Sequence, residues 1–151
     1  MNTSTYRYTE CGLDNVEIKG MHSMTDDAGE AVYGVTNILG LHKAISHGII
    51  TKTGSIGADE LRFLRTEMGL TQAELAQIVK KEHQTIGRWE RGESPIDRNA
   101  EALIRLTARE RLDLDTNMTT EEIAAKCVPS ATLTVITIDG SDPENYHPVA
   151  A

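Results

Sequence analysis

The amino-acid sequence predicts a mainly α-helical protein with small amounts of β-structure toward both ends. Apolar residues recur at helical spacing, punctuated by glycines, from residue 58 to residue 111. Two short β-like runs precede that region, and one β-branched run follows it. The length of 151 residues suits one ordinary domain with an appendage. We therefore expect three parts: a small α+β N-terminal subdomain over residues 1–56, a helical domain over 57–111, and an acidic C-terminal extension over 112–151 with a short helix, a strand and a frayed end.

The N-terminal subdomain contains two predicted strands and one predicted helix. VEIKG and AVYGVT are rich in β-forming residues, and the Asp-Asp-Ala-Gly between them indicates a turn. The helix that follows has apolar residues at helical spacing, with Asn37 as its N-cap and Gly48 as its end. The polar, glycine-containing ITKTGSIG comes next, and we expect the boundary of the subdomain there.

Local signals define the first two helices of the central region. ADELRFLRTEM carries an apolar stripe and ends at Gly69. The next helix begins with Thr71 as its N-cap, and Glu74, three residues later, completes a capping box.

Two further helices are predicted in the same region. One runs from about Glu82 to Arg91 and ends at Gly92. The other begins with Ser94 as its N-cap and Pro95 in the first helical position, where the missing N–H of proline costs nothing.

The C-terminal extension is predicted to form one short helix and one strand. Thr119 and Glu122 have the spacing of a capping box and open the helix. TLTVITI alternates and is β-branched, so it is predicted to be a strand. Because a lone apolar strand would leave its backbone groups unpaired, we expect it to pair with VEIKG or AVYGVT.

The distribution of charge is more informative than the net charge of −8, which by itself argues against nucleic acid. Residues 58–111 hold ten of the fifteen basic residues and are neutral overall. Residues 112–151 carry one basic and seven acidic residues. Most of the positive charge is therefore concentrated in the central helices, and most of the acidity lies in the tail.

The sequence contains none of the usual signs of a membrane, secreted, metal-binding or enzymatic protein. No apolar run approaches the ~20 residues of a membrane span, and the N-terminus has no signal-peptide region, so we expect a cytoplasmic protein. Cys11 and Cys127 are too few for a disulfide framework or a four-cysteine zinc site. No nucleophile–base set, glycine-rich phosphate loop or metal cluster is found. We therefore predict no catalytic residue, no metal and no cofactor.

The helix near residues 83–90 has two different sides. On a helical wheel counted from His83, Ile86 and Trp89 fall near about 300° and 240°, which makes one packing face. The opposite sector, between roughly 0° and 140°, carries polar side chains and a glycine that lets a partner approach closely: His83, Gln84, Gly87 and Arg88. Gln and Arg match the major-groove edges of adenine and guanine, so this sector is predicted to face DNA.

The segment LTQAELAQIVKKEHQTIGRWERGESP resembles the helix-turn-helix of the Cro/repressor-like, or Xre, transcriptional regulators, over about residues 58–108. The shared features are the Thr-Gln-x-x-Leu-Ala opening, the apolar Ile86 and Trp89, and the closing Trp-Glu-x-Gly. The resemblance implies a five-helix Cro/repressor-like domain and also implies a set of roles. Base edges would be contacted by His83, Gln84 and Arg88, the phosphate backbone by Thr71, Gln72 and Thr85, and a structural ion pair would join Arg65 and Glu90.

Two positions depart from that family pattern. The turn between the two helices usually has a glycine, but here it reads Lys80-Lys81. Since a residue other than glycine is mildly disfavoured at positive φ, the turn is expected to change shape or shift by one residue. Glu82 at the N-cap of the second helix would favour the helix dipole but repel a phosphate.

These features predict a sequence-specific transcriptional regulator, acting as a homodimeric repressor on an inverted repeat in double-stranded DNA. The alternative is an antitoxin whose flanking segments bind a toxin protein and whose DNA binding regulates its own operon. The N-terminal YTECGLDNVEIKG resembles a segment that precedes such a module in regulators of the MqsA/YgiT antitoxin group. The zinc-binding CxxC pairs of that group are missing, so no metal role is carried over.

Overall fold

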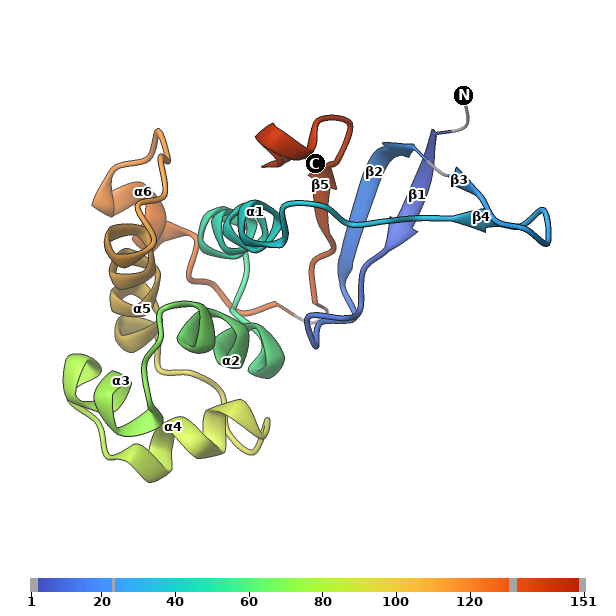
Figure 1. Cartoon of the computed structure of the whole chain (residues 1–151). Helices are drawn as coiled ribbons and strands as arrows, with labels where there is room; N and C mark the ends of the chain where they lie inside the picture. The colour runs from blue at the N-terminus through green and yellow to red at the C-terminus, as the bar shows by residue number, and fades with distance from the viewer. Residues whose placement is uncertain (1–2, 23, 131–132, 150–151) are drawn as a thin grey trace. The chain divides into compact units, whose positions relative to one another are not determined.

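The computed structural model of the chain describes three stretches, residues 3–22, 24–130 and 133–149. The chain divides into two compact units, and Figure 1 labels their helices and the strands β1 to β5. Unit 1 combines Met1–Gly48 with Val135–Ala151, and unit 2 is Ile49–Thr134. These units divide the chain differently from the three predicted segments. The C-terminal strand joins the N-terminal sheet, and the predicted connector joins the helices of unit 2.

Unit 1 is built on a four-stranded sheet with the strand order β1-β2-β5-β6. The strands are β1 (Thr3–Arg7), β2 (Val16–His22), β5 (Ile136–Asp139) and β6 (His147–Pro148). β5 pairs with β2 in parallel, with Ile18 opposite Ile138, so the predicted pairing of TLTVITI with VEIKG is confirmed. The other neighbours are antiparallel. Alternate residues of a strand face the same side, and those on one side of β2 and β5 are buried: Val16, Ile18, Ile136 and Ile138.

The C-terminal residues belong to this sheet, so the predicted frayed end is wrong for residues 143–149. A short 3-10 turn, Pro143–Asn145, leads into β6. The Tyr146 hydroxyl donates to the carbonyl oxygen of Thr36 at 2.7 Å. A strand of two residues has no periodicity of its own, and for this reason the sequence pattern did not indicate it.

A small hairpin precedes the first helix of unit 1. β3 (Met24–Thr25) pairs with β4 (Ala31–Val32). Asp26 closes the predicted turn, because its Oδ1 accepts hydrogen bonds from the N–H groups of Ala28 and Glu30. Only the first two residues of the predicted AVYGVT strand are paired, and the rest leads to the helix without forming a strand.

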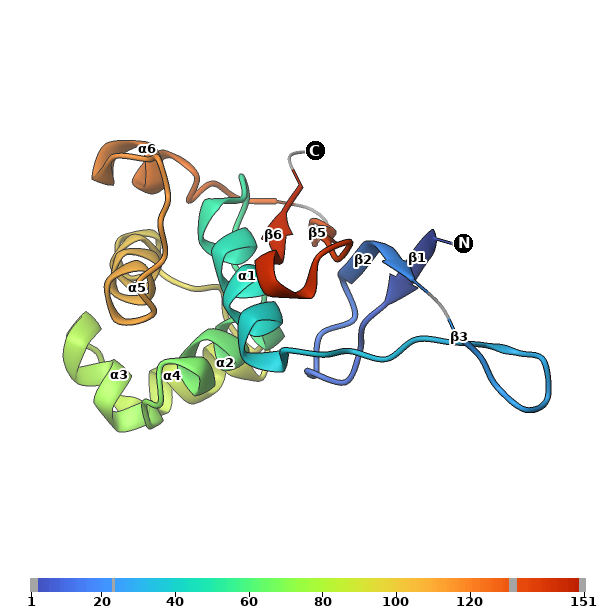
Figure 2. The same cartoon turned by 45° about the horizontal axis from the view of Figure 1, so that its top comes forward.

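Helix α1 (Ile38–Thr51) lies beside β5 and β6 in Figure 2. Asn37 caps it as predicted, since its Oδ1 accepts from the N–H of Gly40 at 3.2 Å. The helix continues through Gly48, where the sequence predicted its end. A Cβ at Gly48 would lie 2.7 Å from Cγ2 of Ile136, so this glycine lets β5 pack closely against the helix.

Unit 2 consists of the end of α1 and a set of further helices: α2 (Ala58–Glu67), α3 (Gln72–Val79), α4 (His83–Glu90), α5 (Arg98–Arg111) and α6 (Thr120–Ala125). Gly69 ends the first of these as predicted, with φ +71°. The predicted capping boxes, Thr71 with Glu74 and Thr119 with Glu122, are both present. Among the described residues, no helix is long and apolar enough to cross a membrane.

The start of α5 differs from its prediction. Asp97 is the N-cap, because its Oδ2 accepts a hydrogen bond from the N–H of Ala100 at 3.0 Å. Ser94 and Pro95, the predicted start, instead lie in the loop that leads from α4 to α5. That loop packs over Trp89, and a helix beginning at Ser94 would remove this cover.

Buried charges fix the predicted connector, ITKTGSIG, to unit 2. Arg105 is fully buried and pairs with Glu101 at 2.8 Å. Its guanidinium also donates to the carbonyl oxygens of Ile50, Lys52 and Gly54. A buried guanidinium needs such partners to offset its lost hydration. The connector is therefore part of unit 2, and the division between the two units falls directly before it, between Gly48 and Ile49.

Candidate nucleic-acid interface

Helices α3 and α4 are joined by a short turn in which a lysine, and not a glycine, adopts the left-handed backbone conformation. Lys80 has φ 59° and ψ 45°. The N–H groups of Lys80 and Lys81 both donate to the carbonyl oxygen of Ala76 and so close the end of α3. Glu82, the N-cap of α4, is exposed, and its side chain makes no capping hydrogen bond.

One side of α4 is buried in unit 2. Ile86 is fully buried, and Trp89 and Glu90 are almost so. Gly87 is also buried, although the helical wheel placed it in the polar sector. A Cβ there would lie 2.9 Å from Nη1 of the exposed Arg91 and 3.5 Å from Oε1 of Gln72, an ordinary contact distance, so the Arg91 side chain covers this glycine. The close approach of an outside partner at this glycine stays a prediction.

The other side of α4 presents polar side chains. His83, Gln84 and Arg88 are exposed, and Thr85 is half-buried. Thr71 is exposed at the start of α3, where its Oγ1 accepts from the N–H of Glu74 at 3.0 Å. The sequence pattern thus placed three of the four polar-sector residues on the exposed face of one helix. An amide and a guanidinium one turn apart on such a face can each donate to an acceptor on a neighbouring molecule.

An ion pair between α2 and α4 holds the helix that carries this face. Arg65 Nε lies 2.5 Å from Glu90 Oε2, and Arg65 Nη2 lies 2.9 Å from Glu90 Oε1. This bidentate geometry is the strong form of an arginine–carboxylate contact. Burial alone would raise the pKa of Glu90, but the hydrogen bonds from Arg65 and Gln72 hold it below its ordinary value. The hydrogen bond to Glu90 likewise raises the pKa of Arg65.

Gln72 belongs to this ion-pair network as well as to the start of α3. Its Nε2 donates to Glu90 Oε1 at 3.2 Å, and its side chain is half-buried. An amide nitrogen carries two hydrogens, so one remains for another acceptor. Gln72 therefore orients α4 in addition to any contact it makes outside the chain.

Comparison with known protein families assigns this region. Residues 61–114 match the family model described as Helix-turn-helix, of the Cro/C1 type in the Xre family. This segment is a Cro/C1-type helix-turn-helix domain. Such a domain supports a DNA-binding transcriptional regulator, and its family is not an enzyme family. No curated protein and no solved structure gives a match. The residues of unit 1 lie outside the family match, so the resemblance of their first part to the MqsA/YgiT group stays a prediction.

The sequence reasoning missed Arg91 as a candidate residue of the helix-turn-helix domain. Counted from His83, it falls at about 80° on the helical wheel, inside the polar sector. It is exposed, and its Nε pairs with Oε2 of Glu93 in the following loop. Arg91 directly follows Glu90, the last residue of the buried side of α4, and its place in the polar sector is the signal that identifies it.

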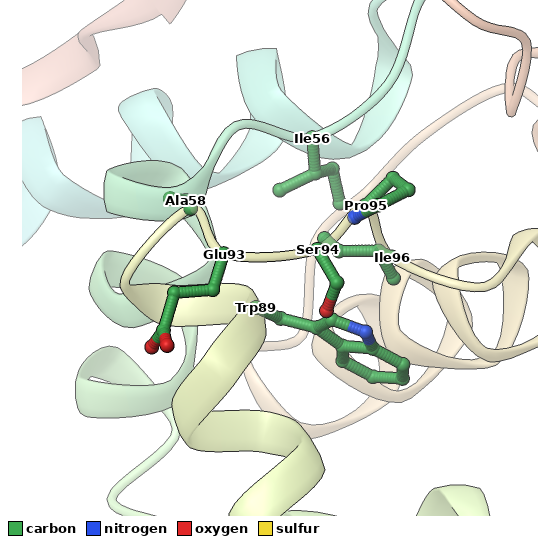
Figure 3. Close-up of a pocket in the computed structure, with 8 residues that line it drawn as sticks. Ile56, Ala58, Trp89, Glu93, Ser94, Pro95 and Ile96 are labelled. Atoms are coloured by element: carbon green, nitrogen blue, oxygen red, sulfur yellow. The ribbon is translucent and has the colours of Figure 1, made fainter.

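A hollow of about 330 Å³ lies beside the end of α4 in unit 2 (Figure 3). Trp89 forms one wall, with the loop residues Ser94, Pro95 and Ile96 around it and Ile56 opposite. The indole is almost fully buried beneath that loop. The hollow is thus the space left where the loop crosses from α4 to α5, and Trp89 acts as a packing residue.

Proposed function

We propose that this protein is a sequence-specific repressor that binds an inverted repeat in double-stranded DNA as a homodimer. The observation that carries the proposal is the exposed face of α4, where Gln84 and Arg88 lie one helical turn apart. The ion pair of Glu90 with Arg65 holds this helix against α2. In this proposal α4 is the recognition helix and enters the major groove. Gln84 and Arg88 donate to adenine and guanine edges, and His83 lies beside them.

The phosphate contacts in this proposal come from the residues around the recognition helix. Thr71 and Gln72 stand at the start of α3, and Thr85 lies on the flank of α4. Contacts to phosphate fix the position of the protein on the duplex and carry no sequence information. Base edges and backbone would therefore be contacted by different sets of residues, and mutations in the two sets can be told apart.

The dimer follows from the size of the site. A single recognition helix covers too few base pairs to select one site in a genome, and domains of this kind solve the problem with two half-sites about one helical turn apart. A repressor needs only to occupy its operator, which the helix-turn-helix domain can do without further chemistry.

The test begins with selection of bound duplexes from a random pool, followed by sequencing. The mass of the complex between the protein and the selected DNA is then measured. We expect an inverted repeat with half-site centres about 10 base pairs apart and two chains per duplex. A selected pool without a common motif, or a motif bound by one chain, would contradict the proposal.

The charge of unit 1 favours a second candidate, the antitoxin. Unit 1 lies outside the family match and contains three basic and nine acidic residues. An acidic module attached to a DNA-binding domain suits a basic protein partner, such as a toxin. Co-expression with the product of the adjacent reading frame tests this candidate: co-purification and relief of growth arrest support it, and independent purification contradicts it.

A further inference from the structure

The end of the recognition helix carries an exposed ion pair between Arg91 and Glu93. The two side chains are 58% and 53% exposed. An ion pair this exposed contributes little to stability, because water competes for both partners. A strong anion can therefore displace the carboxylate without cost to the fold, and phosphate is an acceptor that arginine binds well.

The side chain of Arg91 lies over the glycine one turn before it. A Cβ at Gly87 would lie 2.9 Å from Nη1 of Arg91 and 3.5 Å from Oε1 of Gln72. The guanidinium thus folds back along α4 toward the start of α3, over the place where a side chain is missing. This places its charge on the same side of the helix as Gln84 and close to Gln72, which is proposed to contact phosphate.

Glu93 is directed toward Arg91 and not into the neighbouring hollow. In Figure 3 its carboxylate is turned away from the Trp89 indole, although its backbone belongs to the loop that covers the indole. The N–H of Glu93 donates to the carbonyl oxygen of Arg88 at 2.9 Å, which fixes the loop at the end of the helix. The carboxylate is therefore held where a DNA backbone would have to compete with it.

The geometry points to an exchange of partners: Arg91 binds a backbone phosphate of DNA, and Glu93 competes with that phosphate for the guanidinium. Because a phosphate contact is independent of sequence, Glu93 weakens binding to every duplex by the same factor. The carboxylate thus lowers the affinity for operator and non-operator DNA alike and leaves selection of the site to the base contacts. This inference rests on the proposed function, since it requires α4 to lie against DNA.

The test is a double-mutant cycle measured with a short mixed-sequence duplex and with the selected operator, between about 50 and 200 mM NaCl. Four proteins are compared: wild type, R91Q, E93Q and R91Q/E93Q. Glu82→Gln in both Arg91 backgrounds is the matched control, because it removes one exposed carboxylate at the other end of the same helix. Thermal unfolding of each variant checks that the fold is unchanged.

The expected results are specific to the pair. E93Q tightens binding to both duplexes by about two- to fivefold, the range that loss of a competing exposed ion pair permits. R91Q weakens binding to both and lowers the salt slope by about one. In the R91Q background the E93Q change has no effect beyond that of E82Q. If E93Q has the same effect with and without Arg91, Glu93 acts only through its charge and does not compete for Arg91, which would overturn the inference. An unchanged salt slope in R91Q would overturn it as well.

Failure of the proposed function is distinguishable from failure of this inference. If Gln84→Ala and Arg88→Ala change operator preference while R91Q leaves binding unchanged, only the inference is wrong. If the wild-type protein binds neither duplex, the proposed function is wrong and the inference falls with it.

Discussion

Glu90 is the residue that holds α4 in place. Its carboxylate is buried and accepts hydrogen bonds from Arg65 and Gln72. Burial works against the charged form, but these hydrogen bonds outweigh it and hold the pKa below the ordinary 4.5. A carboxyl group whose pKa is lower in the folded state stabilises the fold when ionised. That contribution is complete above pH 4.5 and is lost as the pH falls through the folded pKa.

Glu90→Gln should therefore change both stability and its dependence on pH. At neutral pH the free energy of unfolding should fall by about 2 kcal/mol, less than for a fully buried pair because Arg65 keeps some solvent contact. Below pH 4.5 the wild type should lose stability more steeply than the variant. Denaturant titrations at several pH values measure this. The double variant R65Q/E90Q should recover part of the loss, and parallel pH profiles for wild type and E90Q would contradict the account.

Lys80 has a strained, left-handed backbone conformation in the turn between α3 and α4. A left-handed conformation costs a non-glycine residue about 1–2 kcal/mol. Glycine avoids this cost but loses more conformational entropy on folding, which offsets about 0.5–1 kcal/mol of the gain. Lys80→Gly should thus stabilise the protein by roughly 0.5 kcal/mol. Lys81→Gly is the control, since Lys81 does not have a positive φ, and it should destabilise. A lower melting temperature for Lys80→Gly would contradict this description of the turn.

At the scale of elements, local signals decided which helices the sequence could predict. Thr71 and Glu74 lie within one turn of each other, so four consecutive residues are enough to predict the start of α3. The start of α5 was missed because Ser94 and Asp97 are both good N-caps, and the packing of the loop over Trp89 selects the second. The sequence contains the candidates in such cases, and tertiary packing chooses between them.

Substitutions at two of the glycines inside helices, Gly48 and Gly87, are predicted to change stability in opposite directions. An added methyl group at Gly48 meets the buried Ile136 at 2.7 Å, so Gly48→Ala should destabilise by about 1–3 kcal/mol through overpacking. At Gly87 the nearest atom belongs to the flexible, exposed Arg91, which can move. Gly87→Ala should therefore gain up to about 1 kcal/mol from helix propensity. Chemical unfolding of both variants measures the difference, and the same sign for both would contradict the packing described here.

At the scale of the whole molecule, contacts distant in sequence were the hardest to predict. The pairing of β5 with β2 was predicted because a lone strand would leave its backbone groups unpaired, but the parallel direction of the pairing was not predicted. The ion pair of Arg65 with Glu90 was expected only from the family resemblance, because residues 25 apart share no local pattern. Unit 1 has no family match, so only the structure shows that it combines the first and the last segments of the chain.

Unit 1 should depend on the last segment of the chain. A chain that ends after Thr134 lacks β5 and β6 and leaves one hydrogen-bonding edge of β2 unpaired. Amide hydrogen exchange should then become fast in β1 and β2, while α2 to α5 keep their protection. A chain that ends after Val149 is the control and should retain protection throughout. Slow exchange in β2 of the shorter chain would show that the sheet does not need its C-terminal strands.

The central claim is that the exposed face of α4 reads DNA sequence, and a titration of three variants against the selected operator and its single-base substitutions tests it most directly. Gln84→Ala and Arg88→Ala should each cost about 1–3 kcal/mol on the operator and abolish the preference at one symmetric position per half-site. Gln72→Ala should weaken all the duplexes by a similar factor, because a phosphate contact and a positioning contact carry no base information. Equal losses on every duplex for Gln84→Ala and Arg88→Ala would show that this helix does not read the sequence.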